Sequence, residues 1–287
     1  MDAKQRIKPC LWFDGKAEEA AEFYISLFEN SSIGQVTKFG GEKAVTVEFS
    51  LDGFRVVGLN GGPQFKFTPA ISFFVMCETV EEIDSLWARL TEGGGVMMPL
   101  DAYEWSERYG WGVDKFGMTW QLMHGPVASV GQKVTPCFLF VNEQYGRGEE
   151  AIRLYTSLFP DSPIDGILHY GPNEPGREGT VKHAQFALAG GKFMVMDGPG
   201  EHAWGFNEAV SLIVNCEDQA EIDRYWTRLT EHGGAESMCG WLKDPFGVSW
   251  QVVPTNIGEL LSQPAAVQAM MGMKKLDIQT LLRAPLL

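Results

Sequence analysis

Apolar residues recur along this chain with two different periods, and each period predicts a type of element. Between Glu18 and Leu27 they return every three or four positions, which indicates a helix with one buried stripe. From Ala44 to Leu51 they alternate with polar residues, which indicates a strand, and Asp52-Gly53 after it is a hairpin signal. The same reasoning predicts strands over 8–13, 55–59, 71–75 and 119–123, and a helix over 83–90 that ends at a run of glycines.

This order of elements occurs twice, because three blocks of sequence repeat in the same order. PCLWFDGKAEEAAEFYISLF at 9–28 returns as PCFLFVNEQYGRGEEAIRLYTSLF at 136–159, with four extra residues in its loop. Two later blocks also match, 77–92 with 216–231 and 110–121 with 240–251. The first copy has about nine extra residues near Pro99 to Arg108, which we expect to form a loop carrying Tyr103 and Trp105.

We therefore expect an α+β chain with two copies of one unit, residues 1–130 and 131–256, and a C-terminal helical tail over 257–287. The tail follows only the second copy. Because methionine is an adaptable filler of apolar gaps, Met270, Met271 and Met273 are expected to pack on the body rather than to bind anything.

Composition changes this picture only by excluding classes of partner. At 45% hydrophobic and 21% charged, the 287 residues are typical of a globular protein. A formal net charge of −14 without a cluster of Lys and Arg argues against nucleic acid, and no apolar run approaches the roughly 20 residues of a membrane span. The five cysteines include no CxxC pair and the start has no apolar signal core, so we expect free thiols and a cytoplasmic protein.

The segments PCLWFDGKAEEAAEFYISLF, AISFFVMCETVEEIDSLWARL and GWLKDPFGVSWQVVP resemble the PhnB-like branch of the vicinal oxygen chelate (glyoxalase/bleomycin-resistance) superfamily. The resemblance implies tandem βαβββ modules that curl mixed β-sheets into cups around a small ligand. It also implies that the duplicated chain builds internally the dimer that single-copy members form, while a further homodimer stays open. The branch carries a demethylubiquinone methyltransferase label. We do not adopt it, because the glycine clusters at 93–95 and 190–191 follow a helix or lie in a hairpin, unlike a nucleotide-binding turn.

Metal-dependent relatives hold an ion in each cup with His and Glu from four strands, and the resemblance carries these positions onto this sequence. One cup receives Lys8, Glu48, Ala209 and Gln251, and the other receives Thr135, Gln185, Ala70 and Gln121. A protonated lysine and an alanine offer no lone pair to a divalent ion. We therefore predict neither a metal nor any other cofactor.

Lys8 and Glu48 would place a cation and an anion where the metal otherwise lies, so this pair is a candidate for orienting an oxygen-bearing ligand. The alternative is that both are ordinary solvated side chains. Cys10 and Cys137 share strand faces with Lys8 and Thr135. Without a matched histidine nearby, we expect buried structural thiols rather than nucleophiles.

Other side chains extend the candidate site. His183, two residues before Gln185, would face the second cup and is a candidate for acid–base work or an ordinary hydrogen-bonded histidine. Trp12 has no match in the second copy and is a candidate for stacking on a flat ligand. Tyr103 and Trp105 would form either a lid over one cup or a surface loop.

These observations predict a metal-free small-molecule binding protein with two unequal cups. The alternative is an enzyme of the same superfamily, of isomerase, lyase or dioxygenase type, with a divergent active site. The predicted ligand-binding residues are Lys8, Cys10, Trp12, Glu48, Gln121, Thr135, His183, Gln185 and Gln251.

Overall fold

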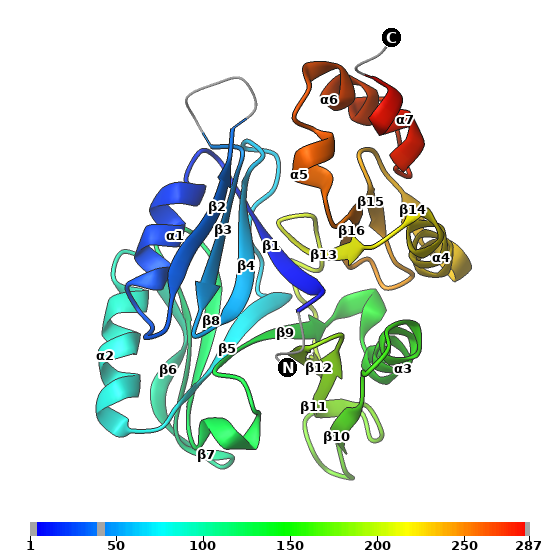
Figure 1. The fold of residues 1–287 in the computed structure, drawn as a ribbon. Helices are drawn as coiled ribbons and strands as arrows, with labels where there is room; N and C mark the ends of the chain where they lie inside the picture. The colour runs from blue at the N-terminus through cyan, green and yellow to red at the C-terminus, as the bar shows by residue number, and fades with distance from the viewer. Residues whose placement is uncertain (1–4, 39–43, 285–287) are drawn as a thin grey trace.

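The computed structural model describes residues 5–38 and 44–284 and places the strands in two eight-stranded mixed sheets (Figure 1). Sheet one has the order β14-β15-β16-β13-β1-β4-β3-β2, and sheet two has the order β10-β11-β12-β9-β5-β8-β7-β6. The first copy contributes β1 (Ile7–Phe13), β2 (Ser32–Thr37), β3 (Thr46–Leu51), β4 (Phe54–Asn60), β5 (Ile71–Cys77), β6 (Gly95–Tyr103), β7 (Ser106–Val113) and β8 (Thr119–His124). The second contributes β9 (Val134–Phe140), β10 (Ile164–His169), β11 (Val181–Leu188), β12 (Gly191–Asp197), β13 (Val210–Cys216), β14 (Ala235–Glu236), β15 (Trp241–Lys243) and β16 (Ser249–Pro254).

Each sheet takes four strands from each copy, so neither copy completes a sheet by itself. Each copy consists of two successive βαβββ units, and one unit enters each sheet. The seam of sheet one is the antiparallel pair β1–β13, where Lys8 lies beside Ile213. The seam of sheet two is the antiparallel pair β5–β9, where Phe74 lies beside Thr135. The predicted α+β class with duplicated modules and mixed sheets is confirmed.

Two helices cover one face of each sheet, because each helix turns an apolar stripe toward the strands. These are α1 (Ala17–Ile25) and α4 (Gln219–Thr230) on sheet one, and α2 (Val80–Thr91) and α3 (Gly148–Leu158) on sheet two. Helices α2 and α4 begin alike: the side chains of Thr79 and Asp218 each accept a hydrogen bond from a backbone N–H three residues later. The opposite faces of the sheets are called cup one, on sheet one, and cup two, on sheet two.

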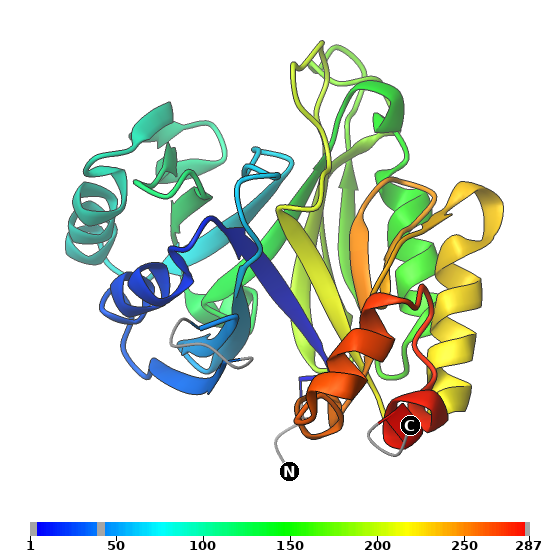
Figure 2. The ribbon, with the colours of Figure 1, turned by 90° about the horizontal axis from the view of Figure 1, so that it is seen from above.

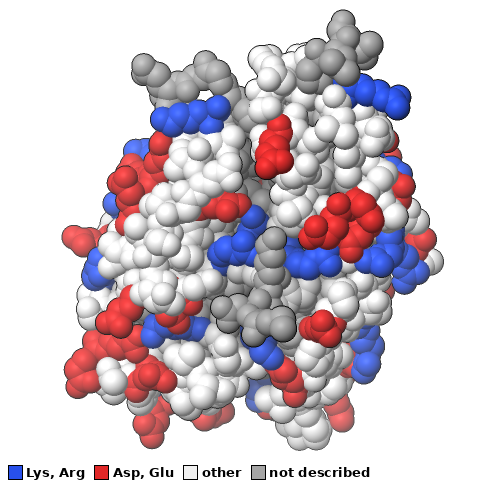
Figure 3. All heavy atoms as spheres, in the orientation of Figure 1, with Lys and Arg blue, Asp and Glu red and all other residues white. Residues whose placement is uncertain are grey.

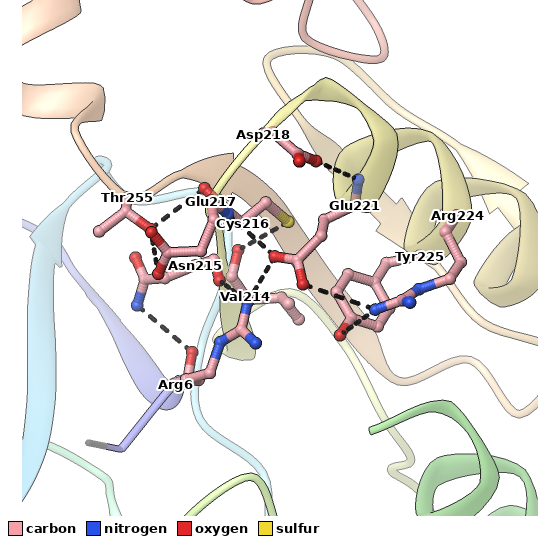
Figure 4. A network of polar contacts seen from close by, with 10 residues as sticks. All are labelled: Arg6, Val214, Asn215, Cys216, Glu217, Asp218, Glu221, Arg224, Tyr225 and Thr255. Atoms are coloured by element: carbon pink, nitrogen blue, oxygen red, sulfur yellow. Dashed lines mark hydrogen bonds and ion pairs between the residues drawn. The ribbon is translucent and has the colours of Figure 1, made fainter. Parts of the chain in front are cut away.

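The contacts that join the two copies are themselves repeated. Arg6, just before β1, forms an ion pair with Glu221 on α4 of the other copy (Figure 4). At the matching place in sheet two, Lys133, just before β9, forms an ion pair with Glu82 on α2. The start of each seam is therefore tied to a helix of the opposite copy.

A buried aspartate organises the turn before the last strand of each copy. Asp244 accepts hydrogen bonds from the hydroxyl of Tyr155 at 2.6 Å and from the indole of Trp250 at 2.8 Å. Two backbone N–H groups of its own turn also donate to this carboxylate. Asp114 is held in the same way in the first copy. The matched Asp and Trp positions of the repeat are therefore parts of the scaffold.

The prediction that the extra residues of the first copy, near Pro99 to Arg108, form a loop is wrong. Strands β6 and β7 run through it as an extended hairpin that turns at Glu104 and Trp105, with Tyr103 paired to Ser106. The register between β6 and β7 shifts three times, so the apolar alternation that marks a strand is broken in the sequence. Strand β2 was not predicted either, because it lies at a sheet edge with nearly all of its side chains exposed.

The C-terminal tail is helical, as predicted, but it consists of three short helices: α5 (Ile257–Leu260), α6 (Pro264–Met271) and α7 (Ile278–Arg283). Figure 2 shows it on the side of β1 and β13. Met270 and Met273 pack against the body as expected. Met271 does not, since 57% of it is exposed.

On the face drawn in Figure 3, acidic and basic side chains lie next to one another rather than in separate fields. None of the helices in the described part of the chain combines the length and the apolar character that crossing a membrane requires.

Candidate functional site

Cup one contains the predicted ion pair. Lys8 on β1 donates from Nζ to Oε1 of Glu48 on β3 at 2.5 Å, and the lysine side chain is only 10% exposed. Gln251 on β16 lies on the same face and donates to the hydroxyl of Ser211 at 3.0 Å. Ala209 precedes β13 and is fully buried. The structure therefore brings Lys8 and Glu48 together, while the use of this pair by a ligand stays a prediction.

The C-terminal tail covers much of cup one. Cys10 and Ile213 form an apolar cluster with Leu276 of the tail, and Met270 and Met273 pack against this cluster. Leu276 is completely buried. The tail also accepts backbone hydrogen bonds at 2.7 Å from the residues just before β15. The chain thus covers with its own side chains a surface that the sequence predicts to bind a ligand.

One of these donors, Gly240, explains how the tail comes so close. A Cβ atom at this position would lie 3.0 Å from a backbone oxygen and 3.2 Å from the Leu276 side chain, and its φ is +83°. Glycine adopts such a φ without the strain that other residues incur. The matched glycine of the first copy, Gly110, instead faces Trp87 of α2.

Cup two presents a row of four side chains across adjacent strands. The strand registers place Thr135 of β9 beside Phe74 of β5, Phe74 beside Gln121 of β8, and Gln121 beside Trp111 of β7. Paired residues share a face of the sheet, so all four point into cup two. Thr135 and Trp111 are three strand spacings apart, which is roughly 14 Å.

The polar groups of this row are only partly satisfied. Gln121 accepts from the Tyr109 hydroxyl at 2.7 Å and donates to the Ser72 hydroxyl at 2.8 Å. Within the described residues, the indole nitrogen of Trp111 and the hydroxyl of Thr135 are buried without a hydrogen-bond partner. The indole nitrogen of the matched Trp241 in cup one is not among the buried groups without a partner. Buried polar groups are nearly always paired, so these two point to a missing partner.

Two other hydroxyls in the described residues are also buried without a partner. They belong to Thr119 in cup two and to Ser249, which holds the matched position in cup one. Because both copies share this feature, it does not distinguish the cups. The distinguishing groups are Trp111 and Thr135.

The rest of cup two is apolar and rich in methionine. The methionines that contribute to its cluster, with Phe74, Tyr109 and Cys137, are Met76, Met98, Met123, Met194 and Met196. Flexible thioether side chains let such a lining change shape around different ligands. His183 lies at this lining, with its ring centre 6.2 Å from that of Phe74, and burial lowers its pKa. The His183 ring therefore lies beside Phe74 of cup two, while its use in binding or catalysis stays a prediction.

The extended hairpin borders cup two rather than cup one. Tyr103 stacks on Trp105 with ring centres 5.0 Å apart, and Tyr103 meets Tyr109 edge-on at 5.7 Å. Trp105 is 55% exposed. Lys182 on β11 has a raised pKa, mainly because of its hydrogen bond with Glu174. Through Tyr103 and Tyr109 the hairpin therefore borders the cluster that lines cup two.

The remaining predicted residues are placed as follows. Gln185 on β11 donates to Asp165 at 3.0 Å, at the edge of cup two. Trp12 lies on cup one at its rim, where it lines a cavity. Burial raises the pKa of the Cys10 thiol to about 11 and that of Cys137 to about 12. Thiols of such high pKa remain protonated, which favours structural roles for both.

The residues at the superfamily's metal positions do not fit a metal. In cup one, Glu48 is engaged by the Lys8 ammonium and Ala209 has no donor atom. In cup two, the amide of Gln121 is already bonded on both sides. Across residues 5–38 and 44–284, no group of three or more His, Cys, Asp or Glu side chains is placed to hold an ion.

Comparison with known proteins agrees with this architecture. A sequence model of the family described as 3-demethylubiquinone-9 3-methyltransferase matches residues 5–123 and 132–253, once for each copy. The chain belongs to this family. The PhnB protein of Bacillus cereus is 39% identical over 42% of this chain and all of its own, with a TM-score of 0.41. No curated protein matches the chain.

Two solved structures that match most of this chain share its fold. Glyoxalase I from Zea mays is 10% identical, with a TM-score of 0.56, over 89% of this chain and 95% of its own. A Bacillus subtilis protein named as a candidate dioxygenase is also 10% identical, with a TM-score of 0.52, over 95% of this chain and 91% of its own. The fold is therefore that of the glyoxalase/bleomycin-resistance superfamily.

Two residues of cup two, Trp111 and Tyr109, are absent from the ligand-binding residues that the sequence predicts. Tyr109 did carry a signal, because the second copy has Cys239 at that position. A phenol that replaces a thiol at a matched position can mark where the two cups diverge.

Proposed function

We propose that this protein binds a small molecule in cup two without using a metal ion. The supporting observation is the pair of buried, unpartnered groups on cup two, the Trp111 indole N–H and the Thr135 hydroxyl. Leaving such a group unpaired costs roughly 1–3 kcal/mol, and a ligand with matching polar atoms would recover part of that free energy. The ligand would lie across Phe74, with one acceptor at Trp111 and a second polar group at Thr135.

The unequal covering of the two cups supports the choice of cup two. In cup one, Lys8 and Glu48 already bind each other, and the tail packs over Cys10 and Ile213. Cup two has an adaptable methionine lining and an aromatic hairpin at its border. Apolar walls with a few convergent polar groups are typical of small-molecule sites.

The methyltransferase description of the family does not fit the glycine-rich turns of this chain. Gly93 to Gly95 follow α2 and enter β6, and Gly190 lies in the hairpin between β11 and β12. Neither turn leads from a strand into a helix, which is the context that binds a nucleotide-like cofactor. A superfamily enzyme with a divergent site is the second candidate, favoured by His183, whose lowered pKa leaves a neutral imidazole facing cup two.

A thermal-shift screen of aromatic metabolites and antibiotics tests the proposal. We expect compounds that raise the melting temperature of the wild type to lose most of that shift in Trp111→Phe and Thr135→Val. Without ligand, both variants should melt at or slightly above the wild-type temperature, because each removes a buried group that has no partner.

Matched variants in cup one serve as controls. Trp241→Phe and Glu48→Gln should keep the full ligand-induced shift. A ligand that is lost in these variants but retained in Trp111→Phe would place the site in cup one. Stoichiometric divalent metal in the purified protein, measured by elemental analysis, would contradict metal-free binding.

A further inference from the structure

A separate cavity of about 500 Å³ opens at the rim of cup one, entirely within the first copy. It lies where the loop after β1, the loop from β4 to β5 and the turn between β7 and β8 meet. Its aromatic walls include Trp12, Phe65 and Phe116, and its charged walls include Lys16, Lys66 and Lys115. None of these residues belongs to cup two.

The aromatic walls are held in place by contacts among themselves. Trp12 donates its indole N–H to the carbonyl of Gly62 at 2.7 Å, and its ring packs on the backbone at Gly61, where a Cβ atom would come within 2.3 Å of it. Phe65 meets Trp12 edge-on at 5.0 Å between ring centres. The two rings therefore form a preorganised apolar corner that needs no rearrangement to receive a flat ligand.

The charged wall has three lysines and two acidic residues, Asp14 and Glu19. The Glu19 carboxylate forms ion pairs with two of the lysines: it accepts a hydrogen bond from Lys16 at 2.7 Å and lies 3.6 Å from the ammonium group of Lys115. No ion pair involves Lys66 within the described residues, and this side chain is exposed at the cavity mouth. In a chain with a net charge of −14, such a local excess of lysine favours an anionic ligand.

The second copy shows that the opening is a specific feature of the first. There the four extra residues form a turn over Asn142 to Gln144, and the Asn142 side chain bonds the facing loop at the carbonyls of His202 and Trp204, at 3.0 and 2.9 Å. Arg147 occupies the position of Lys16 and donates to the carbonyl of Pro245 at 3.0 Å. In copy two, side chains of the first loop thus bond both facing segments, whereas among the described residues of copy one no side-chain hydrogen bond joins residues 14–16 to residues 65–67 or 115–117.

We propose that this rim cavity binds a planar aromatic molecule carrying one acidic group, such as an aromatic carboxylate. The ring lies against Trp12, Phe65 and Phe116, and the acid meets the ammonium groups of Lys66 and Lys115. This site is independent of cup two and does not depend on the function proposed for it.

Titration calorimetry with naphthoate tests the assignment, with the uncharged naphthamide as the matched probe. We expect naphthoate to saturate one site and naphthamide to bind at least about tenfold more weakly, because it lacks the charge that the lysines recognise. Lys66→Gln should weaken naphthoate about tenfold without affecting the fold, since Lys66 is exposed. Lys275→Gln, on the tail, is the control and should bind like the wild type.

A loop transplant gives a second, independent test. Replacing Asp14-Gly15 with the six residues 141–146 of the second copy, VNEQYG, should close the cavity and abolish naphthoate binding. Circular dichroism and the melting temperature establish that this variant folds. Trp111→Phe should leave naphthoate binding unchanged. Equal affinity for naphthamide, undiminished binding by the transplant or by Lys66→Gln, loss of binding in Trp111→Phe, or no saturable binding would each overturn the proposal.

Discussion

The Asp244 side chain is buried away from solvent. Burial raises its pKa to about 6 from an ordinary value of 3.8, although four hydrogen bonds favour the charged form. Between these two pH values the folded chain binds more protons than the unfolded chain. The stability contributed by this group is therefore complete at low pH and is lost as the pH rises from about 4 to about 6.

The substitution Asp244→Asn should remove this part of the pH dependence, because an amide does not titrate. The difference in free energy of unfolding between wild type and variant should change by roughly 2–3 kcal/mol across that window. Urea denaturation at several pH values measures it. Asp114→Asn, at the matched position, should shift in the same direction, since burial also raises the pKa of Asp114. A difference that stays constant with pH would mean that Asp244 has an ordinary pKa.

In the tail, Leu276 is the fully buried side chain of the cluster over cup one. Leu276 is completely buried against cup one, whereas Leu282 on α7 is 51% exposed. Leu276→Ala should lower the free energy of unfolding by about 2–5 kcal/mol through the cavity it leaves. Leu282→Ala should change it by less than about 0.5 kcal/mol. Chemical denaturation measures both.

Thiol labelling reports the same attachment directly. Cys10 lies beneath the tail and is only 2% exposed, so Leu276→Ala should speed its labelling while Leu282→Ala should not. Mass spectrometry separates Cys10 from the partly exposed Cys239. Equal labelling rates in the two variants would show that the tail does not shield cup one.

The elements differ in how far the sequence specifies them. Strand β3 is buried on one face and therefore has alternating apolar residues, and strand β5 is buried on both faces and therefore has a continuous apolar run. Both patterns can be recognised in the sequence. Strand β2, exposed at a sheet edge, and the irregular β6–β7 hairpin leave no such pattern. The docking of the tail depends on contacts with distant strands, and no local periodicity reports them.

The candidate site was predictable to the same extent. Strand alternation fixes which side chains share a face of a sheet. For this reason the sequence could place Lys8 with Glu48 in one cup and His183, Thr135 and Gln121 in the other, and these residues lie so in the structure. That the nitrogen of Trp111, and not that of the matched Trp241, is both buried and without a partner is a property of packing. Repetition in the sequence made Trp111 and Trp241 look equivalent, and the folded surroundings make them different.

Duplication explains why the whole molecule can have two unlike cups. In a symmetric dimer of identical chains, every change in one cup occurs in the other as well. Here the two copies accept changes separately: the tail occupies cup one, the hairpin borders cup two, and the rim cavity opens in the first copy alone. The fold is shared by both halves, while the candidate binding surfaces are not.

The interleaved sheets also predict how the separated copies behave. A fragment of residues 1–130 contains β1 and β5, whose seam partners β13 and β9 belong to the other copy. Unpaired edges of this kind, with buried apolar side chains such as Leu11 and Phe73, favour association with another chain.

We therefore expect fragment 1–130 to form a dimer in which β1 of one molecule pairs with β5 of the other. Light scattering after size-exclusion chromatography measures its mass. Mixing it with fragment 131–287 should produce a one-to-one complex with the mass of the intact chain, because the natural seams carry the Arg6–Glu221 and Lys133–Glu82 pairs. A fragment 1–130 that is folded, shown by circular dichroism, and monomeric at micromolar concentration would contradict the view that the seams between copies hold both sheets together.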